Sequence, residues 1–165
     1  MMKKFYAIAL VAIMALSASA QVSKGDIAAG VNLLYGSEIE SMGLGARFQY
    51  SPIDHLRGEV GINYFFKHNH TTWWDINLNA EWLFTLSENK LYIYPIAGLN
   101  YTMVKYSLND FGEKISDEEN HVGLNLGAGM EYEINEHFAV SLEYRHTIIR
   151  KVDQGVFAIG ANYKF

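Results

Sequence analysis

Hydrophobic and polar residues alternate along most of the chain after about residue 25. The last twelve residues show this pattern most clearly, because every second position is apolar or aromatic up to the C-terminus. These positions are Phe157, Ile159, Ala161, Tyr163 and Phe165. A period of two is typical of a β-strand whose two faces meet different surroundings. A strand that ends on Phe165 predicts that this terminus lies against apolar material.

Seven earlier segments have the same period, so the alternation predicts eight strands in all. They cover residues 25–35, 42–51, 56–67, 72–84, 91–103, 122–134, 138–148 and 154–165. Each has about the 9–11 residues that a tilted membrane strand needs, or slightly more. The fifth segment is less regular, since Tyr92, Tyr94 and Ile96 make both of its faces apolar. Pro95 in that segment cannot donate to a neighbouring strand, which predicts a bulge or a lost hydrogen bond.

The distribution of charged residues between the two strand faces distinguishes a membrane barrel from a soluble one. The apolar faces of the eight segments contain no Asp, Glu, Lys or Arg, and His146 is their only ionisable residue. The opposite faces carry acids and bases that nearly cancel. A soluble barrel of the lipocalin type would place apolar side chains inside and charges in water. The pattern favours the reverse arrangement, an all-β, eight-stranded antiparallel up-and-down transmembrane β-barrel with its apolar faces toward lipid.

An eight-stranded barrel has an interior just wide enough for its own side chains to fill. We therefore expect the charged inner residues to form a plug of charge-assisted hydrogen bonds. The expected members of this lumen ion-pair network are Arg47, Arg57, Glu59, Asp75, Glu81, Glu131, Glu133, Glu143 and Arg145. A narrow pore for small solutes is the less favoured alternative.

The N-terminus has the three parts of a secretory signal peptide. Lys3 and Lys4 form a short basic region, residues 5–16 are apolar, and residues 17–20 offer a small-residue cleavage site. The apolar run is shorter than the ~20 residues of a membrane-spanning helix, which disfavours an uncleaved anchor. We expect a cleavable signal peptide at residues 1–20 and a barrel domain at residues 21–165.

Composition excludes several other classes of protein. The chain has no cysteine, so it can form neither disulfide bonds nor thiolate metal sites. Its net charge of −5 argues against a nucleic-acid partner. Frequent glycine, abundant tyrosine and phenylalanine, and only two prolines favour strands and turns over helices.

Three segments carry a resemblance to a known family. They are the glycine-alternating stretch at residues 123–132, the stretch at residues 140–145, and residues 160–165 with their terminal Phe165. Together they resemble the small eight-stranded outer-membrane barrels of the OmpA and OmpX type. The resemblance implies an outer-membrane location with lipid around the barrel. It also implies that the barrel-assembly machinery reads the C-terminal strand through Tyr163 and Phe165.

An even number of strands would place both termini in the periplasm. The longest outer connection is then residues 104–121, a mostly acidic stretch and a candidate site for an extracellular ligand.

Evidence for catalysis or metal binding is weak. His68 and His70 have a ligand-like spacing but lie in a polar connection. His121, Ser141 and Glu143 include the residue types of a hydrolase triad, but His121 and Ser141 belong at opposite ends of the barrel. We therefore expect no catalytic, cofactor or metal site, and a structural or surface-interaction role. A lipid-modifying enzyme is the second alternative after the narrow porin.

Overall fold

A computed structural model describes residues 23–68, 71–87, 90–110, 113–149 and 153–165 of the chain. Within these ranges the regular structure consists of strands only. The strands are β1 (Ile27–Gly36), β2 (Ser41–Ile53), β3 (Leu56–His68), β4 (Thr71–Trp82), β5 (Phe84–Ser87), β6 (Leu91–Asp110), β7 (Glu113–Glu133), β8 (Phe138–Ile149) and β9 (Gln154–Lys164). No helix in the described part of the chain is long and apolar enough to cross a membrane.

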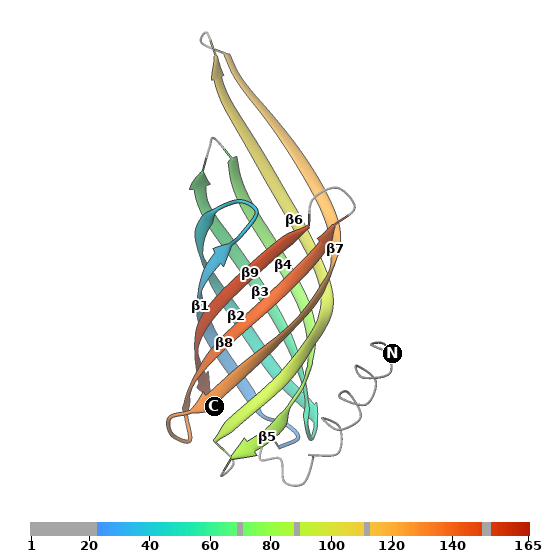
Figure 1. Ribbon diagram of the computed structural model, residues 1–165, viewed down its shortest axis with the longest axis vertical. Helices are drawn as coiled ribbons and strands as arrows, with labels where there is room; N and C mark the ends of the chain where they lie inside the picture. Colours follow the sequence, from blue (N-terminus) through green and yellow to red (C-terminus); the bar gives the residue numbers. More distant parts are fainter. Residues whose placement is uncertain (1–22, 69–70, 88–89, 111–112, 150–152) are drawn as a thin grey trace, which may run out of the picture.

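The strands form one closed antiparallel barrel in which chain neighbours are also spatial neighbours (Figure 1). β1 pairs with β2 on one side and with the C-terminal β9 on the other, which closes the sheet. β4 and β5 both pair with β6 and are two parts of one interrupted strand. The barrel is therefore eight-stranded with up-and-down topology, and the predicted fold class is confirmed.

The interruption between β4 and β5 lies opposite Pro95. β4 ends at Trp82 and β5 begins at Phe84, and the register of both parts with β6 places Pro95 opposite Trp82. A proline has no N–H group, so it cannot complete the ladder here. On the other side of the strand the ladder with β3 continues, because the N–H of Leu83 donates to the carbonyl oxygen of His55, 2.7 Å away. The predicted disturbance at Pro95 is confirmed as a break in one of its two ladders.

The stretch at residues 104–121 differs from the expected loop. β6 and β7 remain paired as far as Asp110 and Glu113, and together they form a long hairpin that rises beyond the other strands (Figure 1). The prediction of a loop was wrong because the apolar positions of β6 change phase at Val104, and because residues 113–121 of β7 contain only one apolar residue, Ile115. After Tyr106 of β6 and before Gly123 of β7, the ribbon has no further partner strand among the described residues and is held by its own backbone hydrogen bonds.

Burial follows the predicted two faces along each barrel strand. Outward apolar side chains such as Val31, Leu78 and Ile159 are more than half exposed, whereas inward polar ones such as Asn77 and Glu81 are almost wholly buried. This inverts the usual distribution in a soluble protein. The arrangement suits a barrel that is surrounded by lipid and filled with polar side chains.

Candidate functional site: the barrel lumen

Arg47 on β2 forms the centre of the buried polar network. Its Nε donates to Oδ1 of Asn162 at 2.8 Å, and its Nη1 donates to Oε2 of Glu59 at 3.2 Å and also to Glu143. Its Nη2 donates to the hydroxyl oxygen of Ser141. The guanidinium therefore ties together β2, β3, β8 and β9 across the lumen, with both of its carboxylate partners buried.

Arg57 on β3 joins two further carboxylates. Its Nε donates to Oε2 of Glu81 at 2.6 Å, and its Nη1 donates to Oε1 of Glu131 at 2.9 Å. The guanidinium carbon lies 4.9 Å from the centroid of the Tyr94 ring, a cation–π geometry. Asn162 links this group to Arg47, since its Nδ2 donates to Oε2 of Glu131 at 2.7 Å. The two arginines and four glutamates thus form one hydrogen-bonded unit.

A second group of polar side chains lies closer to the hairpin end and consists mainly of amides. Asp75 accepts from Nδ2 of Asn63 at 2.7 Å and from Asn77. Asn125 donates to Asn77 at 2.8 Å and to Asn79 at 2.9 Å. Asn79 in turn donates to Oε1 of Glu59 at 3.0 Å, which connects the amides to the charged unit.

The structure places all nine of the expected lumen residues on the inner face, but it does not pair all of them with an opposite charge. Glu133 lies half-buried at the mouth beside the C-terminus and pairs with Lys164. Asp75 is held by amides. Arg145 is buried and forms no ion pair with any described residue, and its Nε has no hydrogen-bond partner among them.

Two apolar clusters inside the lumen were missed by the sequence analysis. One lies toward the hairpin end and contains Leu34, Phe65, Trp73, Val104, Ile149, Val156 and Ala158. The other lies toward the termini and contains Leu83, Tyr92, Tyr94 and Ile96. The signal for the second was the apolar character of both faces at residues 91–96. The signal for the cluster at the hairpin end was the occurrence of two consecutive aromatic residues at positions 65–66 and again at 73–74.

Inward-facing glycines make room for the long polar side chains. A Cβ atom added to Gly129 would lie 2.5 and 2.6 Å from two ring atoms of Tyr94 and 2.8 Å from Cγ of Glu143. A Cβ on Gly160 would collide with the ends of Arg47 and Ser141. Glycine at these positions lets the network cross a narrow interior.

The residues considered for catalysis do not come together. Ser141 pairs with Glu131 on β7, ten residues below His121, a separation of about 33 Å at ~3.3 Å per residue. The Ser141 hydroxyl accepts from Arg47, and His121 contacts Glu119 at 3.2 Å. The His68 side chain and His70 lie outside the described part of the structure.

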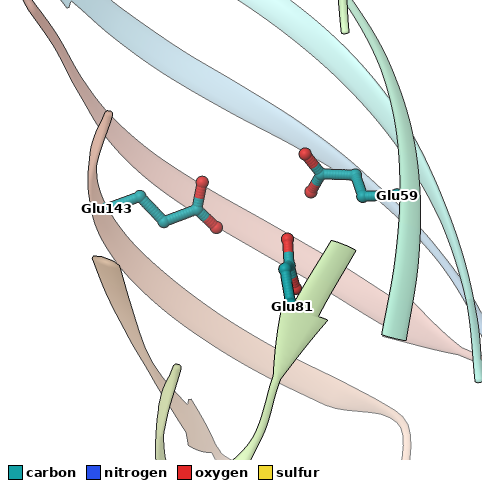
Figure 2. Close-up of side chains that lie close together, drawn as sticks. All are labelled: Glu59, Glu81 and Glu143. Carbon is teal, nitrogen blue, oxygen red and sulfur yellow. The ribbon is translucent and has the colours of Figure 1, made fainter. Parts of the chain in front are cut away.

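One group of side chains has the composition of a cation site. Glu59, Glu81 and Glu143 come from β3, β4 and β8, and one carboxylate oxygen of each lies within 4.8 Å of the others. Figure 2 shows the three carboxylates pointing toward a common centre. All three side chains are buried.

Comparison with known sequences finds relatives among outer-membrane proteins. A family described as "Outer membrane protein beta-barrel domain" matches residues 6–165. The 31 kDa outer-membrane immunogenic protein of Brucella melitensis is 26% identical over 171 residues, which cover 90% of this chain and 70% of the relative. Outer membrane protein X of Enterobacter cloacae is 29% identical over 73 residues, which cover 44% of this chain and 42% of the relative.

Solved structures share the fold at low identity. The N-terminal β-barrel domain of Pseudomonas aeruginosa OprF superposes with a TM-score of 0.73 at 15% identity, covering 86% of this chain and 98% of that one. The attachment invasion locus protein Ail of Yersinia pestis has a TM-score of 0.63 at 18% identity, covering 86% and 99%. At these identities the likeness concerns the fold alone.

Proposed function

Because the chain belongs to the outer-membrane β-barrel family, we propose that it is a non-enzymatic surface protein whose plugged barrel holds the β6–β7 hairpin outside the membrane to bind a partner. The protein is located in the outer membrane, as its relatives are, and its apolar outer face contacts lipid. The observation that carries the proposal is the free edge of the hairpin.

The free edge follows from the strand register. β7 pairs with β8 only from Gly123 onward, so residues 113–122 are paired on one side, by β6, among the described residues. The register of β6 with β4 ends at Tyr106. An edge of this kind presents a row of unused N–H and C=O groups to which an extended peptide can add as another strand.

The charge of the hairpin limits the class of partner. Residues 104–121 contain five acidic residues and two lysines. The Ail protein has been solved in complex with the heparin analogue sucrose octasulfate, a polyanion. An acidic hairpin repels such a ligand, so the partner proposed for this chain is an extended polypeptide that is neutral or basic.

The plugged lumen supports this role over transport of small solutes. The charged unit crosses the barrel together with the apolar cluster around Tyr94, which contacts Arg57 and Glu143, and the other apolar cluster lies toward the hairpin end. Such an interior stabilises the barrel as a rigid base for the hairpin.

The start of β1 and the C-terminal Phe165 lie together, with the N–H of Phe165 3.0 Å from the carbonyl oxygen of Ile27, at the end of the barrel opposite the hairpin (Figure 1). We propose that this is the periplasmic end. There Tyr163 packs edge-on against Phe138 and Phe165, with ring centroids 5.1 and 5.2 Å apart. Tyr163 and Phe165 are exposed on the outer face. We assign them to recognition by the barrel-assembly machinery, and residues 1–20, outside the described residues, to a signal peptide.

The hairpin proposal can be tested with the folded protein in lipid nanodiscs. A library of extended peptides is screened for binding, and amide hydrogen exchange is measured with and without a bound peptide. We expect selected peptides to be neutral or basic and to protect the amides of residues 113–122. A variant in which residues 108–115 are replaced by a short turn should lose this binding. Equal binding by this trimmed variant, or protection elsewhere, contradicts the proposal.

A further inference from the structure

We propose that Glu59, Glu81 and Glu143 form a binding site for one hard divalent cation, of the Ca²⁺ class, at the centre of the lumen. The three carboxylates come from different strands and meet with one oxygen each inside a 4.8 Å limit (Figure 2). Oxygen ligands at ~2.3–2.6 Å from a cation can be at most about 5 Å apart. The three oxygens are therefore close enough to share a single ion.

Each carboxylate keeps an oxygen that no arginine occupies. Oε1 of Glu81 is buried and accepts no hydrogen bond from the described residues, and the whole side chain is shielded from solvent. The hydrogen bonds of Glu143 from Arg47 and Tyr94 both use its Oε1, which leaves Oε2. Glu59 uses Oε2 toward Arg47, and its Oε1 accepts only from the neutral amide of Asn79. A buried acceptor without a donor is costly, and a cation at this point satisfies it.

The charge of the surrounding unit requires about two further positive charges. Arg47 and Arg57 each bond two carboxylates, so two cations face four anions in Glu59, Glu81, Glu131 and Glu143. The remaining charged side chains of the described lumen balance, with Asp75 and Glu133 against Arg145 and Lys164. An uncompensated buried charge is strongly unfavourable. One divalent ion neutralises the excess, and an all-oxygen ligand set selects a hard cation.

The ion count after folding tests the site directly. The purified chain is folded into detergent micelles with Ca²⁺, free ion is removed on a chelating resin, and the retained Ca²⁺ is measured by atomic emission. We expect about one Ca²⁺ per folded wild-type barrel and a higher unfolding temperature than after folding in EDTA. Glu81→Gln should retain none. Glu133→Gln, which removes a carboxylate at the mouth, should retain the ion.

Loss of Ca²⁺ from the folded wild type, or equal retention by Glu81→Gln, overturns the proposal. A gel-mobility assay confirms that each variant is folded. If Glu81→Gln does not fold, Tb³⁺ luminescence excited through tyrosine replaces it, because the Tyr94 hydroxyl lies 2.8 Å from Glu143. We expect Ca²⁺ to quench this signal in the wild type and Tyr94→Phe to weaken it. An unchanged signal in Tyr94→Phe refutes the site.

Protons are the competing source of the missing positive charge. Infrared spectroscopy of the wild type detects a protonated carboxyl group by its carboxylic-acid band. If this band is unaffected by Ca²⁺ and disappears in Glu81→Gln, the proposal is also overturned. A band that appears only after folding in EDTA supports it, because protons then replace the ion.

Discussion

Arg57 shows what a single side chain contributes to the lumen. It bonds Glu81 and Glu131, both wholly buried, so its removal leaves two carboxylates without their cation. We predict that Arg57→Met lowers the free energy of unfolding by about 3–5 kcal/mol, measured by urea unfolding in lipid vesicles. Lys164→Met is the control, because its partner Glu133 is only half-buried and its loss should cost about 1 kcal/mol or less. Equal losses in the two variants contradict the prediction.

Gly129 shows how closely the side chains in the lumen are packed. A Cβ atom at this position meets the Tyr94 ring, which is packed inside the barrel, whereas a Cβ on Gly58 has its nearest neighbour at 3.7 Å. We predict that Gly129→Ala destabilises the barrel by roughly 1–3 kcal/mol through overpacking. Gly58→Ala should leave the unfolding transition nearly unchanged. A similar urea midpoint for both variants would show that Tyr94 can move aside.

For single residues, the sequence predicts which face of the barrel a side chain points to, but not which side chains it bonds. Alternation with a period of two places Arg47, Asp75 and Arg145 alike on the inner face, and the structure agrees. The alternation does not reveal that Arg47 bonds two glutamates, that amides hold Asp75, or that Arg145 forms no ion pair with the described residues. Those outcomes depend on the stagger between strands, which is set by closure of the whole barrel and cannot be read from one segment.

At the scale of the element, β6 and β7 combine two different environments. From Gly123 to Glu133, β7 has β8 as a second neighbour, whereas residues 113–122 pair with β6 alone among the described residues. Amides in a ribbon outside the barrel open with little loss of packing. We predict that residues 113–122 exchange their amide hydrogens well before residues 123–133, as measured by mass spectrometry of the folded protein. Uniform protection along β7 would mean that another surface covers the ribbon.

The barrel strands could be predicted from the sequence because each has one face in lipid and one face in the lumen. The ribbon beyond the membrane lacks this difference between its faces. Lipid on one side and a polar lumen on the other impose alternation, which identified all eight barrel strands. The disturbance at Pro95 was predicted separately, from the missing N–H group of proline. Beyond the membrane neither face must be apolar, so β6 and β7 run past the predicted ends at residues 103 and 122. In β6 the alternation continues through Val104, Tyr106 and Leu108, but in the opposite phase to Tyr101 and Met103, and residues 113–121 of β7 contain a single apolar residue, Ile115.

At the scale of the whole molecule, closure of β1 against β9 makes the barrel a single cooperative unit. No strand edge is left open in the wall, so detergent cannot separate the strands one at a time. We predict that an unboiled sample migrates differently from a boiled sample on a detergent gel. The hairpin variant with residues 108–115 replaced should keep this shift, because the wall is intact. Identical migration of boiled and unboiled wild type would count against a closed barrel.

Conductance through the barrel depends on its closed wall and on the side chains that are packed in its lumen. A solute must pass the apolar cluster around Phe65 and Trp73 and then the unit of Arg47 and Arg57, against which the cluster around Tyr94 is packed. Each of these layers is built from side chains that contact one another across a narrow bore. We predict no steady single-channel steps when the purified protein is inserted into planar lipid bilayers. An unrelated open porin in the same bilayers provides the positive control. Regular unitary steps in the wild type that vanish when the chain is unfolded beforehand would favour the narrow-porin alternative over the plug.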